Sequence, residues 1–160
     1  MIRRQLRTSL KACQAGAVTV EFAFAFMIFW TAMMAVFEFS RLMLTWGAAS
    51  EATRVAARLA AVCDKTPDQQ AVIRRRVAGL LTASGQIDLG TSTDWLLITY
   101  YPAGCTAESC TFVEAKLSNL HPVMMIPGLS QAVTLPDFRI NSPRESMRNS
   151  IKGELNNVCY

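Results

Sequence analysis

A single carboxylate, Glu21, stands within a long apolar stretch near the start of the chain. Sixteen residues without a charge follow it, from Phe22 to Phe37, and residues 17–20 extend the apolar run backwards. A charged side chain at the centre of a bilayer costs about 2.5–3.5 kcal/mol on insertion scales, so such a residue is interpreted first as functional. The chemistry open to Glu21 is ion pairing with a cation in a medium of low dielectric constant. The alternative is a shallow position near the headgroups, where the carboxylate would do nothing.

The apolar stretch itself predicts a membrane-spanning helix. A run of about 20 apolar residues, at ~1.5 Å per residue, crosses a hydrocarbon core of roughly 30 Å. The residues before Ala17 include no acid and four basic side chains, Arg3, Arg4, Arg7 and Lys11. Because basic flanks stay on the cytoplasmic side of a membrane, we expect the C-terminal part of the chain on the other side.

Gly16 stands between the basic head and the apolar run, five residues before Glu21. This arrangement resembles the class III signal of type IV prepilins. In that family a membrane prepilin peptidase cuts after the Gly on the cytoplasmic face, and the Glu pairs with the new N-terminal ammonium of a neighbouring subunit. The resemblance implies processing between Gly16 and Ala17, and assembly through Glu21 and Phe22.

Three segments resemble the TadE-like family, the minor pseudopilins of tight-adherence (Tad, Flp) pilus systems. The resemblance covers about residues 15–62, and its three segments are Gly16–Ala23, Glu38–Arg41 and Ala52–Ala61. The chain departs from the family pattern at residues 27–29, which lack the common Pro, and at Ser40 and Ala57, where Gly is usual. The resemblance implies a protein that primes or caps a Tad/Flp pilus. Its implied partners are the lipid bilayer, a prepilin peptidase, other Tad/Flp pilins and inner-membrane assembly proteins.

The implied location is the bacterial inner membrane, crossed once, with the N-terminus in the cytoplasm and the C-terminal domain in the periplasm. A different class of protein fits the same topology: an unprocessed, membrane-anchored periplasmic module that binds or scaffolds another envelope complex. Cleavage at Gly16 separates the two hypotheses.

The basic character of the chain does not indicate a nucleic-acid partner. The formal charge is +4, but removal of residues 1–16 takes away four of the sixteen Lys and Arg and leaves the twelve Asp and Glu. The sequence has one His and contains no Gly-rich phosphate loop, no G-x-S-x-G elbow and no metal-ligand constellation. We therefore predict no enzyme activity, no cofactor, no metal and no small-molecule substrate.

The five cysteines cannot all pair in disulfides, because five is an odd number. Cys13 lies in the leader, so the remaining part of the chain has four. The short loop between Cys105 and Cys110 favours a disulfide there, which leaves Cys63 to pair with Cys159. The alternative interpretation is a metal site. The wide spacing of Cys105 and Cys110 and the presence of only one His in the sequence argue against it. Two disulfides are ordinary in an oxidising compartment.

The pattern of the chain predicts an α+β fold in three parts. These are a leader (1–16), the transmembrane part of a long helix (17–46) and an extracytoplasmic, pilin-like α+β domain (47–160). The helix should continue to Val62, and its apolar stripe should pack on the domain through Ala48, Ala52, Val55, Ala56, Leu59 and Val62. At the membrane exit, Glu38 and Arg41 are spaced for a local ion pair.

The domain should hold one further helix and an antiparallel sheet of about three strands. Thr66 and Pro67 begin the helix, which runs to about residue 84 with Gly85 as its stop. The expected strands are 95–101, 111–117 and 138–141, the last resuming at 145–148. We expect Arg74-Arg75-Arg76 to be a solvated face of the helix, with a partner-binding patch as the alternative. The run Met124-Met125-Ile126, in a loop over 119–136, should tuck into the core rather than form a docking site.

Overall fold

The computed structural model describes residues 2–83, 87–90, 93–126, 133–151 and 153–159, with side chains from residue 16 onward except that of residue 151. The expected stop at Gly85 lies outside the described residues. The chain divides into two compact units, Met1–Ser40 and Arg41–Tyr160. We call the second unit the head.

The long helix α1 spans Ile2–Val62. Its end agrees with the prediction, but the helix begins at Ile2 rather than at Ala17. The physical reason is that the residues before Gly16 are mostly good helix formers (Leu, Arg, Lys, Ala and Gln) and include no Pro. Nothing in this stretch therefore breaks the helix.

Within the head, the last part of α1 contributes small side chains to the core. The residues of α1 that are buried here are Thr45, Ala49, Ala52, Thr53, Ala56, Ala57, Leu59, Ala60 and Ala61. Helix α2 (Pro67–Ala83) faces the same core with Ile73, Val77 and Leu81, while Leu80 is exposed. The amide of Gln69 donates to the Thr66 hydroxyl over 3.3 Å, so Thr66 caps α2 as the sequence predicts.

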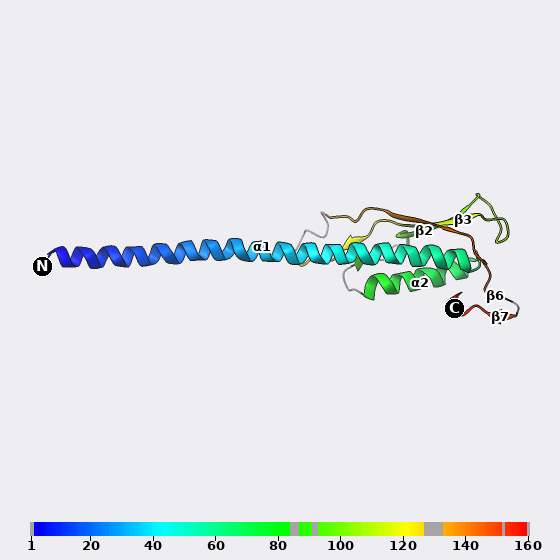
Figure 1. The fold of residues 1–160 in the computed structure, drawn as a ribbon, viewed down its shortest axis with the longest axis horizontal. Coiled ribbons are helices and arrows are strands. Elements are labelled where there is room, and N and C mark those ends of the chain that lie inside the picture. Colours follow the sequence, from blue (N-terminus) through cyan, green and yellow to red (C-terminus); the bar gives the residue numbers. More distant parts are fainter. Residues whose placement is uncertain (1, 84–86, 91–92, 127–132, 152, 160) are drawn as a thin grey trace. The chain divides into compact units, whose positions relative to one another are not determined.

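The main sheet has three antiparallel strands in the order β2-β3-β5. They are β2 (Leu96–Tyr101), β3 (Phe112–Leu117) and β5 (Phe138–Pro143). The central strand β3 alternates buried and half-buried residues, as the period of a strand facing a core on one side requires. Figure 1 shows α2 and the strands alongside the last part of α1, with which they share one hydrophobic core.

Four short strands escaped the sequence analysis. They pair as β1 (Ile87–Asp88) with β4 (His121–Pro122) and as β6 (Ser150–Ile151) with β7 (Glu154–Leu155). Two-residue ladders have too few residues to show a period. The 3₁₀ turn η1 (Asn157–Cys159) follows, so the tail has local structure of its own.

The expected resumption of a strand at 145–148 is wrong. The backbone amides of Glu145 and Arg148 instead donate to the carbonyls of Ala61 and Val62, over 3.1 and 3.0 Å. The last carbonyls of a helix have no partner within the helix. This segment supplies partners for the end of α1 instead of extending the sheet.

The expectation that Met124-Met125-Ile126 tuck into the core is also wrong. Met125 is 66% exposed and Ile126 is 46% exposed, while Met124 is half-buried. These residues follow the short strand β4, whose partner β1 supplies only two residues of pairing. Other side chains nearby in the sequence are buried in the core instead, including Leu120 and Leu135.

Candidate assembly site

The residues predicted for processing and assembly lie on one continuous stretch of α1. Gly16, Ala17, Glu21 and Phe22 are all exposed. Outside its own helix turn, a Cβ atom added at Gly16 would meet no atom of the described residues within 4 Å. Packing among these residues therefore does not require a glycine at position 16.

An aromatic row continues along the helix from Phe22. The rings of Phe22 and Phe26 stack with centroids 6.3 Å apart, and those of Phe26 and Trp30 with centroids 6.1 Å apart. The spacing of four residues places these side chains on one face of a helix. They are 69%, 52% and 50% exposed, so the row presents its apolar area to the surroundings of the helix.

The hydroxyl groups of this part of the helix are also compatible with a hydrocarbon environment, because they form hydrogen bonds within the helix. The Thr31 hydroxyl donates to the carbonyl of Met27 over 2.5 Å, and the Ser40 hydroxyl donates to that of Val36 over 2.8 Å. In lipid, polar groups must be satisfied internally. By length and composition the helical segment Gly16–Val62 can cross a membrane, which indicates a single-pass membrane protein.

Glu38 and Arg41 lie at the end of this apolar part. Glu38 is buried, whereas Arg41 is half-buried and its Nη2 donates to the carbonyl of Val123 over 3.3 Å. Sequence reasoning missed this contact because it joins residues that are 82 positions apart. The ion pair between Glu38 and Arg41 stays a prediction.

Comparison with known families gives one match, which coincides with this stretch of helix. Residues 16–58 match the model of the TadE-like protein family. The match confirms the resemblance found in the sequence and suggests a protein associated with a Tad pilus. The TadE-like family is not a family of enzymes. No curated protein and no solved structure matches the chain.

The TadE-like match ends at Arg58, and the structure has its disulfides beyond that point. Cys63 is bonded to Cys159, with Cα atoms 5.6 Å apart, and Cys105 is bonded to Cys110, with Cα atoms 5.0 Å apart. These are the two pairs that were predicted from the short loop between Cys105 and Cys110. The first bond joins the residue after α1 to the end of the chain, across a sequence separation of 96 residues.

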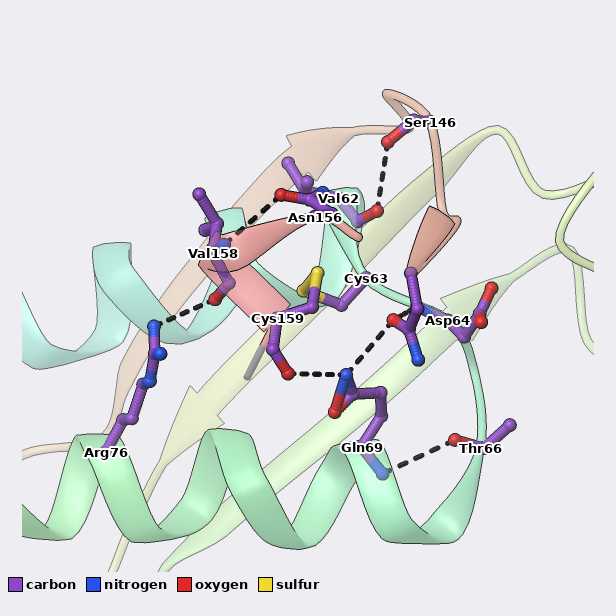
Figure 2. Close-up of a disulfide and its surroundings, with 11 residues drawn as sticks. Val62, Cys63, Asp64, Thr66, Gln69, Arg76, Ser146, Asn156, Val158 and Cys159 are labelled. Atoms are coloured by element: carbon purple, nitrogen blue, oxygen red, sulfur yellow. Dashed lines mark hydrogen bonds between the residues drawn. A yellow bond between two sulfur atoms is a disulfide. The ribbon is translucent and has the colours of Figure 1, made fainter. Parts of the chain in front are cut away.

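A polar network surrounds the Cys63–Cys159 bond (Figure 2). The Gln69 side chain is buried, and its Nε2 donates to the carbonyl of Cys159 over 2.6 Å and to Oδ1 of Asn149 over 3.0 Å. The same Asn149 oxygen accepts from the amide of Asp64 over 3.1 Å. The end of α1, the start of α2 and the tail are therefore held together by hydrogen bonds as well as by the disulfide.

The three consecutive arginines of α2 do not form one solvated face. Arg76 donates from Nη1 to the carbonyl of Val158 over 2.8 Å, and Arg74 donates from Nη2 to that of Leu96 over 3.5 Å. Successive residues of a helix point about 100° apart. Arg74 and Arg76 accordingly bind different segments, the edge of the sheet and the tail. Arg74 is half-buried, whereas Arg75 and Arg76 are exposed.

The head offers little that resembles a catalytic site. Among the residues that the structure describes, no three His, Cys, Asp or Glu side chains gather as a metal site would require. An open pocket of about 300 Å³ near the tail has a mainly aliphatic lining, with Arg58 and Glu145 beside it. Burial raises the pKa of Tyr100 to about 12, partly offset by the Gln70 side chain, so this phenol stays neutral at physiological pH.

Proposed function

We propose that this chain is a minor pseudopilin of a Tad/Flp pilus, cut between Gly16 and Ala17 by a prepilin peptidase, and that it primes or caps the pilus. The observation that carries the proposal is the position of the TadE-like match. The match begins at Gly16 and covers the apolar run 17–37, in which Glu21 is the single carboxylate.

The proposed mechanism assigns Glu21 a role after cleavage. Cleavage would create an ammonium at Ala17 on each subunit. Both that ammonium and the Glu21 carboxylate are costly when each is alone in a medium of low dielectric constant, but they attract strongly when paired. Pairing between neighbouring subunits would offset both costs and set the axial register of the helices.

The surface of the helix supports assembly in a bundle. Small side chains allow helices to approach closely in membranes, and four exposed alanines are distributed along this part of α1: Ala23, Ala25, Ala32 and Ala35. The exposed aromatic row Phe22-Phe26-Trp30 supplies bulk that a neighbouring helix can contact. This chain alone leaves both features uncovered.

The proposed setting is the bacterial inner membrane, with the N-terminus in the cytoplasm and the head in the periplasm. The four basic residues before Ala17 favour that orientation, and two disulfides in the head suit an oxidising compartment. The proposed partners are the bilayer, the prepilin peptidase, other Tad/Flp pilins and inner-membrane assembly proteins.

Substitutions at Gly16 and Glu21 test the two steps separately. We expect Gly16→Val to leave the precursor at full length, since the peptidase needs a residue without a side chain at the cut. We expect Glu21→Gln to be cut but to lose cross-linking to pilin partners, and Glu21→Asp, which is one methylene shorter, to be intermediate. The measurements are the N-terminal mass of the membrane-extracted protein and the yield of partner cross-links.

The same helix supplies matched controls. Gly47 also has no atom within 4 Å of an added Cβ, so Gly47→Val should be processed normally. Glu51 is exposed and pairs with Arg54 at 3.6 Å, and Glu51→Gln should assemble normally. If the wild type keeps its full-length mass, the protein is better described as an unprocessed anchored module. If Gly16→Val is cut like the wild type, cleavage does not depend on Gly16; if Glu21→Gln assembles like the wild type, the carboxylate is only a tolerated charge.

A further inference from the structure

The head has an exposed apolar loop that the assembly mechanism does not use. It comprises residues 123–126, directly after β4, in which Val123 is 43%, Met125 66% and Ile126 46% exposed. The loop belongs to a long uncharged stretch of the sequence, since no Asp, Glu, Lys or Arg lies between Lys116 and Asp137. Exposed groups of large apolar side chains mark contact surfaces rather than ordinary solvated surface.

The position of this loop along α1 is set by a hydrogen bond. Arg41, the first residue of the head, donates from Nη2 to the carbonyl of Val123. Arg41 follows the uncharged segment 22–37 by only a few residues on the same continuous helix. Chain connectivity therefore keeps the loop next to the point at which α1 leaves the membrane, whatever the orientation of the head.

The opposite end of the head provides a contrast. The tail is bonded through Cys159 to Cys63, just after the end of α1. The 22 residues of helix from Arg41 to Val62 extend over about 33 Å at ~1.5 Å per residue. Leu155, in β7 near that tail, is 65% exposed, so it matches Met125 in exposure but lies at the far end of the helix.

Side chains of α1 at the level of the loop have the same character. Met43, Leu44 and Trp46 are 45%, 64% and 46% exposed. The Trp46 ring also contacts Phe138 edge to face, with centroids 5.6 Å apart. Tryptophan is enriched where a membrane protein meets the headgroup region, because its ring is apolar and its N–H is polar.

We propose that residues 123–126, together with Arg41, bind the phospholipid surface from which α1 emerges. Val123, Met125 and Ile126 would enter the boundary between headgroups and acyl chains, as apolar side chains of interfacial segments do. The Arg41 guanidinium holds the loop by one N–H and has further N–H groups that can bind a lipid phosphate. The contact would fix the head against the membrane before assembly.

Two features favour lipid over a protein partner: the loop is attached to the helix that enters the membrane, and the loop itself carries no charged side chain. A surface tethered beside the bilayer meets lipid at a high effective concentration. The loop carries no charged residue that would specify a protein partner, and its one associated cation suits anionic headgroups. The proposal depends on α1 spanning a membrane, but not on cleavage at Gly16 or on a pilus.

Photo-cross-linking in vesicles tests the proposal on the full-length chain. A photoreactive phenylalanine analogue is placed at position 125 or, as the matched control, at position 155, in protein reconstituted with phosphatidylcholine and phosphatidylglycerol. We expect several-fold more lipid adduct from position 125 than from position 155. Equal adduct from both positions, or adduct only with a second protein chain, would overturn the proposal.

A second variant examines the role of Arg41. Arg41→Met removes both the donor to Val123 and the positive charge. Methionine favours a helix about as well as arginine does. We expect the lipid adduct from position 125 to fall several-fold, while the Cys63–Cys159 disulfide still forms, as a mass measurement without reductant would show. An unchanged adduct yield in a correctly oxidised variant contradicts the role given to Arg41.

Discussion

The two parts of α1, residues 16–40 and 41–62, belong to one helix but have opposite environments. In the first part the large side chains are exposed, with Phe22 at 69% and Ile28 at 71%. In the second part the buried side chains are mostly small, and Ala56 and Ala60 have no exposed surface. Burial along this helix therefore does not follow hydrophobicity, because the most apolar part is the least covered.

The difference shows what each part is built to contact. The second part fills a core shared with α2 and the sheet, where alanines let the other elements approach the helix backbone closely. Among the described residues most of the first part is exposed, and the surroundings that we propose for it are lipid and other helices. We therefore expect the same substitution to change the free energy of unfolding of the head differently in the two parts of α1. Paired substitutions at alanine and threonine measure the difference.

The largest expected effect concerns the bond that fastens the second part of α1 to the tail. Replacing Cys63 and Cys159 together by Ala should lower the free energy of unfolding of the head by roughly 4–5 kcal/mol, since the bond closes a long loop in the unfolded chain. The measurement is guanidinium unfolding of the full chain in detergent, followed by near-ultraviolet circular dichroism.

The second disulfide is the control for this prediction. Replacing Cys105 and Cys110 together by Ala opens a loop with a sequence separation of only 5, so the chain-entropy cost is roughly 2 kcal/mol. If both double variants lose the same stability, the Cys63–Cys159 bond does not act mainly through loop closure. Its contribution would then have to come from contacts in the folded head, such as the hydrogen bonds made by Gln69.

Enlarging one alanine in each part of α1 should have the next largest effect. Ala56→Leu adds volume to a site with 0% exposure, and overpacking of that kind costs about 1–3 kcal/mol. Ala25 is exposed in the first part, so Ala25→Leu should leave the unfolding of the head unchanged. The same unfolding measurement compares them, and equal losses would mean that the two parts are not energetically separate.

How far the sequence predicted this structure differs between the two parts. The first part could be predicted nearly completely, because an uninterrupted apolar run with a basic flank has few physical interpretations. In the second part the period of alanines predicted the buried face approximately, as at Ala52 and Ala56. It could not predict the precise face, since alanine is tolerated in many environments and Ala60 and Ala61, outside the expected stripe, are also buried.

The tail and the network around Gln69 could not have been predicted from local pattern. The side chain of Gln69 finds its partners 80 and 90 positions away, and a buried amide looks like any exposed glutamine in a sequence. The short loop between Cys105 and Cys110 did favour the observed disulfides, because it left only one pairing for the other two cysteines. Gly16 and Glu21 were singled out because of their spacing in the sequence, and their roles in processing and assembly stay predictions.

The smallest expected effect comes from two threonines that make the same bond in the two parts of the helix. The Thr53 hydroxyl donates to the carbonyl of Ala49 over 2.7 Å in the core, and the Thr31 hydroxyl donates to that of Met27 in the exposed part. Thr53→Val removes a buried hydrogen bond, and we expect the head to lose about 0.5–1.5 kcal/mol of its free energy of unfolding. The loss should not be larger, because a carbonyl within a helix still accepts a backbone N–H from four residues on.

Thr31→Val is the matched substitution and should leave the unfolding of the head unchanged. Its hydroxyl is satisfied within its own helix turn, so a methyl group in its place faces lipid or a neighbouring helix at little cost. Should Thr31→Val destabilise the head as much as Thr53→Val does, unfolding of the head would also involve the first part of α1. The boundary near Ser40 would then separate two environments without separating two units of stability.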